Sequence, residues 1–192
     1  MSGHKLTLQH DYVNKFHQGV AILPQQYLEL NGPLIAIEVR VHPDMVHALK
    51  QLGKPVPDPI KGQAMIDSGV QVTAIDISVA ESLQLQKTSK VEVVGIGGRS
   101  EGYTSACSIH IPGLPLTTSA TRAHCHDLTK TGQNIIALIG RDILRMMTFS
   151  YDGINGQVRL VYPQPLGANP PKKGGSAAQQ NPKRNPRGKR RR

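Results

Sequence analysis

Asp67 is the residue in this chain best placed for acid–base chemistry. An apolar run at 64–66 reads as a buried strand, and Ser68 and Gly69 then form a tight turn that holds a single carboxyl group. Burying a carboxylate is unfavourable unless it is paired or hydrogen-bonded, and proteins accept this most readily where the acid performs chemistry. The alternative use of this pattern is a turn aspartate that bonds to its own backbone.

Two further segments that could contribute to a functional site follow in the chain. The glycines between 95 and 98 separate strand-like segments, which is typical of a hairpin tip. A continuous apolar run at 135–139 predicts a buried strand, and Gly140, Arg141 and Asp142 turn it into a short helix with Asp142 as the N-cap.

His124, Cys125, His126 and Asp127 are consecutive and resemble a set of metal ligands. Neighbouring residues on a strand point to opposite faces, so they rarely converge on one metal ion. We therefore expect a polar loop here, with no metal and no cofactor. Cys107 and Cys125 are expected to be reduced thiols, as is usual without a secretory signal.

Short strands and helices must position these residues. Pro43 opens a helix that Gly53 ends, a proline-rich loop follows at 54–59, and Ser78 with Glu81 predicts a capped helix at 79–85. The weak signal at 20–30 fits a strand or a short helix. Strands are expected at 34–41, 60–67, 72–77, 91–94, 103–111, 114–123, 135–139, 149–151 and 158–161. Many short strands with few helices predict a mainly β fold.

The 192 residues divide by composition into three parts. We expect a mobile N-terminal arm at 1–19, one β domain at 20–163 and a disordered basic tail at 164–192. The net charge is +10, and nine of the 23 basic residues lie in 172–192, where no acidic residue occurs. This segment predicts either nonspecific contact with nucleic acid or an anionic surface, or a solubilising tail.

Two absences bear on location. No apolar stretch approaches the roughly 20 residues that span a bilayer, so no transmembrane segment is expected. The first residues lack the basic-then-apolar pattern of a secretory signal, which predicts a cytoplasmic location.

Three segments together resemble the retropepsin-like aspartic proteases, and bacterial retropepsin-like proteins in particular. Their order and spacing agree over roughly residues 30–163. The matching segments are Ile66-Asp67-Ser68-Gly69, Val93-Val94-Gly95-Ile96-Gly97-Gly98 and Ala137-Leu138-Ile139-Gly140-Arg141-Asp142-Ile143-Leu144. The resemblance implies an acid-protease half-barrel with a flap hairpin and short helices, completed by homodimerisation.

The implied activity is that of an aspartic endopeptidase with one catalytic Asp67 in each chain. Two facing carboxyl groups would share a proton; one would activate water as general base and the other would protonate the peptide carbonyl. Ser68 would hydrogen-bond across the dimer axis, and Gly69 would let the substrate backbone approach. An extended peptide would bind beneath the flap tip, Gly95, Ile96, Gly97 and Gly98, and above a structural turn formed by Gly140, Arg141 and Asp142.

Val70 and Gln71 depart from the family pattern. Ala or Ser usually follows the Asp-Ser-Gly, so the branched Val70 would narrow the substrate groove. Gln71 replaces an acid that, in retroviral members, pairs with the arginine matched by Arg141, so support of the turn must differ here. The alternative function is a catalytically weak or inactive peptide-binding or scaffolding dimer whose basic tail binds nucleic acid.

Overall fold

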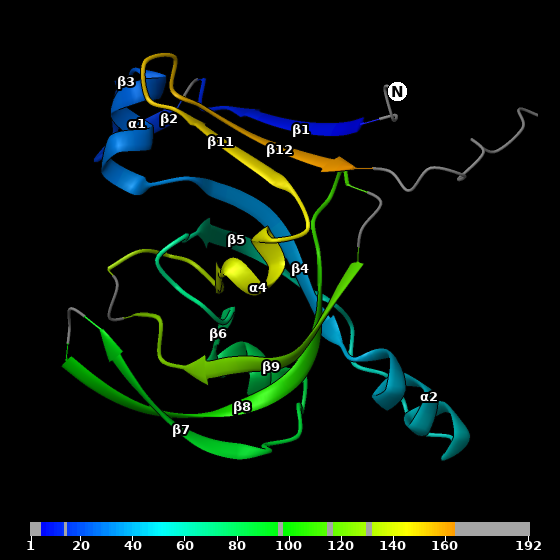
Figure 1. Ribbon diagram of the computed structural model, residues 1–192. Helices are drawn as coiled ribbons and strands as arrows, with labels where there is room; N and C mark the ends of the chain where they lie inside the picture. Colours follow the sequence, from blue (N-terminus) through cyan, green and yellow to red (C-terminus); the bar gives the residue numbers. More distant parts are fainter. Residues whose placement is uncertain (1–4, 14, 96–97, 115–116, 130–131, 164–192) are drawn as a thin grey trace, which may run out of the picture.

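The computed structural model describes residues 5–13, 15–95, 98–114, 117–129 and 132–163 (Figure 1). The predicted basic tail, 164–192, lies outside the described residues. The strands are β1 (Lys5–Asp11), β2 (Lys15–His17), β3 (Val20–Ile22), β4 (Leu34–Val41), β5 (Ile60–Ile66), β6 (Ala74–Asp76), β7 (Ser89–Gly95), β8 (Gly98–His110), β9 (Thr117–His126), β10 (Ala137–Ile139), β11 (Thr148–Asp152) and β12 (Gln157–Pro163). The helices are α1 (Pro24–Asn31), α2 (Pro43–Gln51), α3 (Ile77–Ser82) and α4 (Arg141–Leu144). The mainly β class is confirmed.

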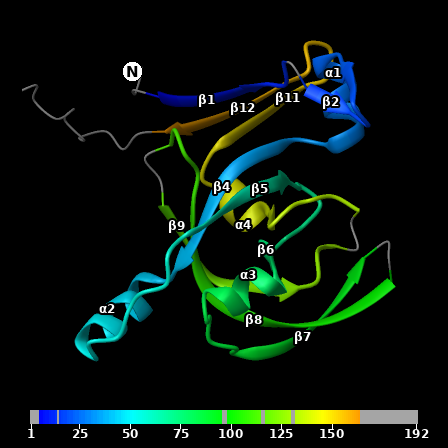
Figure 2. The ribbon, with the colours of Figure 1, turned by 180° about the vertical axis from the view of Figure 1, so that it is seen from behind.

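A seven-stranded sheet forms the body of the molecule, in the order β4-β5-β10-β6-β9-β8-β7. β4 also pairs with β8, so the sheet curves back on itself (Figure 1). β1, β12 and β11 form a second sheet, and β2 pairs with β3. Seen from behind, α2 projects away from the sheets (Figure 2), and none of its residues is buried.

Apolar side chains that alternate along the strands build one core. On β4, for example, Ile35, Ile37 and Val39 are buried, while the residues between them are more exposed. The short central strand β10 pairs in parallel with β5, with Ile139 opposite Ile66. Because both strands end at this pair, the chain leaves them side by side at Asp67 and Gly140.

The segment expected to be a mobile N-terminal arm, residues 1–19, contains strands β1 and β2 in its described part. β1 pairs with β12 along its whole length, from Lys5 opposite Pro163 to Asp11 opposite Gln157. Tyr12 is buried, and its hydroxyl donates a hydrogen bond to the Leu34 carbonyl at 2.8 Å. Leu8 packs against the core while its neighbours face outward, so the polar sequence is that of a half-exposed strand.

Four local predictions also need correction. The N-cap of α3 is Asp76, whose Oδ1 accepts from the Ser78 N–H at 2.9 Å, and the helix ends at Ser82. Gly140, and not Asp142, is the N-cap of α4. β6 is shorter than predicted because residues 67–73 form the turn beside α4. The expected polar loop at 124–127 is instead strand as far as His126, since β9 pairs there with β6.

No helix in the described ranges is long and apolar enough to cross a membrane.

Gly156 is the position where the fold depends most directly on a missing side chain. Its φ is +62°, and an added Cβ would lie 2.2 Å from the Pro24 carbonyl carbon at the start of α1. Gly53 has a similar φ of +64° but open space around it.

We expect Gly53→Ala to lower the free energy of unfolding by about 1 kcal/mol, from backbone strain alone. Gly156→Ala should lower it by about 2 kcal/mol more, since α1 must shift. Urea denaturation measures both, and equal losses would contradict the close packing.

Candidate active site

Asp67 lies directly after β5, where its backbone N–H donates to the Ile139 carbonyl of β10 at 3.0 Å. Its side chain is half-buried, not fully enclosed as the apolar run suggested. Oδ1 accepts a hydrogen bond from the Gly69 N–H at 2.8 Å. The carboxyl group is thus held by its own turn and still reaches solvent, an arrangement compatible with both uses considered for this residue.

Gly69 has a specific reason to be glycine. A Cβ at this position would lie 3.0 Å from the Asp67 Oδ1, which is tighter than an ordinary contact. Without that atom the Gly69 N–H approaches the carboxylate closely. Its role in admitting a substrate backbone, and the contact of Ser68 across a dimer axis, stay predictions; Ser68 itself is exposed.

Arg141 fastens the turn to α4. Its Nη1 donates to the carbonyl oxygens of Ser68 and Gly69, at 2.8 and 3.1 Å. Its backbone N–H donates to the Val70 carbonyl at 2.9 Å. The guanidinium therefore supports the turn through main-chain oxygens, which need no acidic partner at Gln71. Val70 is half-buried, and its effect on a substrate groove stays a prediction.

Asp142 forms the second fastening, with Thr73 at the end of the same turn. The Asp142 Oδ1 accepts from the Thr73 N–H at 3.0 Å, the Thr73 hydroxyl at 2.7 Å and the Ile143 N–H at 2.9 Å. The Thr73 Oγ1 in turn accepts from the Gly140 N–H at 3.1 Å. Thr73 is completely buried, and sequence reasoning missed it. The sequence feature that could have indicated it is a hydroxyl residue within the apolar run that leads into β6.

The predicted flap is a β-hairpin. β7 and β8 pair antiparallel from Ser89 opposite Thr104 to Gly95 opposite Gly98. The remaining tip residues, Ile96 and Gly97, lie outside the described residues. The hairpin prediction is confirmed for its strands, and closure over a peptide stays a prediction.

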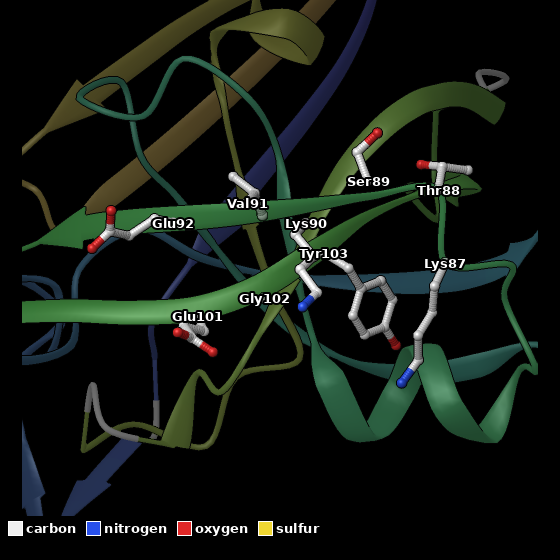
Figure 3. Close-up of a pocket in the computed structure, with 9 residues that line it drawn as sticks. All are labelled: Lys87, Thr88, Ser89, Lys90, Val91, Glu92, Glu101, Gly102 and Tyr103. Carbon is white, nitrogen blue, oxygen red and sulfur yellow. The ribbon is translucent and has the colours of Figure 1, made fainter.

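A cavity of about 670 Å³ lies at the base of this hairpin (Figure 3). It is lined by residues 87–92 and 101–103. No residue of the 67–73 turn contributes to its walls, so this cavity is separate from the candidate catalytic residue.

The His124–Asp127 segment lies on β9 and just beyond it. In the part of the chain that the structure describes, no group of three or more His, Cys, Asp or Glu side chains is arranged to hold a metal ion. Burial lowers the pKa of His124 and of His126, which favours their neutral forms. Cys125 faces the core and is fully buried.

Cys107 and Cys125 are free, buried thiols. Burial raises the pKa of each thiol to about 12, so both stay protonated in the folded protein at pH 8.

We expect alkylation of these thiols by iodoacetamide to be at least about 10³-fold slower in the folded than in the unfolded chain. Above pH 9 the unfolded thiols release protons that the folded ones keep, so stability should fall as pH rises toward 12. Pulsed alkylation with mass spectrometry gives the rates, and comparable rates in both states would contradict this burial.

No family model matches the chain, and no curated protein matches it. Among solved structures, it is similar to an EIAV protease complexed with the inhibitor HBY-793. The sequence identity is 17%, the TM-score is 0.40, and the likeness covers 59% of this chain and 85% of that one.

Proposed function

We propose that this chain is an aspartic endopeptidase that acts as a symmetric homodimer, with one Asp67 in each protomer. The observation that supports it most is the fixed position of the Asp67 carboxyl group. The Gly69 N–H holds that group at 2.8 Å, and Arg141 and Asp142 fasten its turn to α4. General acid–base catalysis requires this kind of preorganised support.

The dimer follows from the chemistry that one carboxyl group cannot perform alone. Peptide hydrolysis by this route needs a base for water and an acid for the carbonyl oxygen. Asp142, on the helix to which the Asp67 turn is fastened, is occupied by Thr73 and Ile143. Asp76 is buried and accepts from the Ser78 and Leu128 N–H groups. A second copy of Asp67 supplies the missing group.

In the dimer the two Asp67 carboxyl groups share one proton, because two adjacent carboxylates cannot both ionise readily. The ionised group takes a proton from water as the oxygen attacks the peptide carbonyl. The protonated group donates to the carbonyl oxygen, and the tetrahedral intermediate then collapses with proton transfer to the leaving amine. The peptide is held extended by main-chain hydrogen bonds beneath the β7–β8 hairpin.

The test is cleavage of an unstructured protein, such as casein, by the full chain at mildly acid pH. Sedimentation velocity on the same samples reports the oligomeric state. Fragments that appear only when the dimer is present support the proposal. A dimer that binds peptides without cleaving them would instead support the peptide-binding alternative.

A further inference from the structure

In the cavity at the base of the β7–β8 hairpin, basic and acidic side chains lie at different positions along the strands. Lys90 lies opposite Tyr103 in the ladder, and two residues further on Glu92 lies opposite Glu101. Lys87 joins the first pair, with its Nζ 4.6 Å from the centre of the Tyr103 ring. One end is therefore cationic and the other anionic (Figure 3). Two residues of a strand separate the ends, about 7 Å.

Tyr103 gives the cationic end a neutral donor. The residue is only 7% exposed, and its hydroxyl has no hydrogen-bond partner among the described residues. Leaving a buried hydroxyl without a partner is unfavourable. A ligand that carries an acceptor, such as a carboxylate, would satisfy this group together with Lys87 and Lys90.

The charged residues of the cavity are available to a ligand. Lys87 contacts Glu81 at 3.6 Å, and Glu92 contacts Arg99 at 3.2 Å. All four side chains are more than half exposed, so these pairs contribute little and exchange readily. A bound ligand can therefore replace them without a large loss.

β7 adds a route for main-chain recognition. It ends the order of the described seven-stranded sheet and pairs only with β8. Half of its peptide groups therefore point away from the sheet, and an extended peptide can add to such an edge. Side chains two positions apart on an extended peptide share one face and are about 7 Å apart. This spacing equals the separation of the two charged ends.

We propose that this cavity binds an extended peptide segment with an acidic and a basic side chain two positions apart. The acidic side chain contacts Lys87, Lys90 and the Tyr103 hydroxyl. The basic side chain lies between Glu92 and Glu101. This inference rests on the proposed function in one respect, that the segment belongs to a protein substrate and is bound apart from the cleaved bond.

Fluorescence anisotropy tests the site on the full chain carrying Asp67→Asn, so that cleavage does not affect the reading. The probe is a dye-labelled peptide, Gly-Ser-Glu-Ser-Lys-Ser-Gly, with blocked ends, and its counterpart has Gln in place of Glu and Lys. Lys90→Glu should weaken binding of the charged peptide at least about tenfold. Lys54→Glu, the same charge change on an exposed loop away from the cavity, should change it less than about twofold.

A charge exchange provides the positive control. The double variant Lys87→Glu with Lys90→Glu should prefer a peptide in which both charged positions are Lys. Tyr103→Phe should weaken the charged peptide about threefold or more without lowering Tm, since the hydroxyl has no internal partner. Equal binding of the charged and Gln peptides, or equal effects of Lys90→Glu and Lys54→Glu, would overturn the site. Either result leaves the cleavage assay on the unmodified chain untouched.

Discussion

Asp67→Asn is expected to abolish peptide cleavage, lowering kcat/KM by about 10³-fold or more. The amide has nearly the shape of the carboxylate, but it cannot take a proton from water or pass one to the carbonyl oxygen. Its oxygen can still accept from the Gly69 N–H, which the structure places 2.8 Å from Oδ1. We therefore expect Tm and the dimer to be retained while activity is lost. A discontinuous assay of casein fragments by mass spectrometry gives the rate.

Asp58→Asn is the matched control, because Asp58 is exposed in the proline-rich loop and the change from acid to amide is the same. Its activity should equal that of the unmodified chain.

Mixing D67N chains with unmodified chains tests the shared site directly. An excess of D67N chains should suppress unmodified chains, since each mixed dimer holds a single carboxyl group. Cleavage that persists in the pure D67N variant, or is unaffected by mixing, would refute the shared site.

Local sequence patterns were sufficient for the segments that carry the candidate site. The apolar run before Asp67, the glycines of the hairpin and the run before Gly140 each predict a strand and its turn from neighbouring residues. The structure has strands or turns at all three places. Their approach in space comes from the parallel pairing of β5 with β10, which brings Ile66 and Ile139 together.

Contacts between distant parts of the chain could not be predicted from local sequence patterns. β1 is stabilised by β12, from Lys5 opposite Pro163, and nothing local in residues 5–11 indicates that partner. Thr73 was missed because it is important through its hydrogen bonds to Asp142, which lies 69 positions away in the sequence. The acceptors of the Arg141 guanidinium are carbonyl oxygens, which every residue carries and no sequence pattern marks.

Asp142→Ala should cause the largest loss of stability among single changes near the site, about 3 kcal/mol. The carboxylate accepts from the Thr73 N–H, the Thr73 hydroxyl and the Ile143 N–H, and Thr73 is completely buried. Removing it leaves those donors without their acceptor. For a domain of this size, such a loss lowers Tm by about 6–12 °C. Because the same contact fixes the Asp67 turn, cleavage should fall even at temperatures where the variant is folded.

Thr73→Val shows whether this effect belongs to the Asp142–Thr73 contact. If the hydroxyl and the carboxylate stabilise the turn together, the double variant should lose less than the sum of the two single losses, by about 1 kcal/mol or more. Asp142→Asn keeps one acceptor oxygen and should fall between the unmodified chain and Asp142→Ala. Additive losses in urea denaturation would mean that the Thr73 hydroxyl does not act together with Asp142, which would then stabilise the turn through the Thr73 and Ile143 N–H groups. Arg141, whose Nη1 donates to the Ser68 and Gly69 carbonyls, would hold the Asp67 turn in either case.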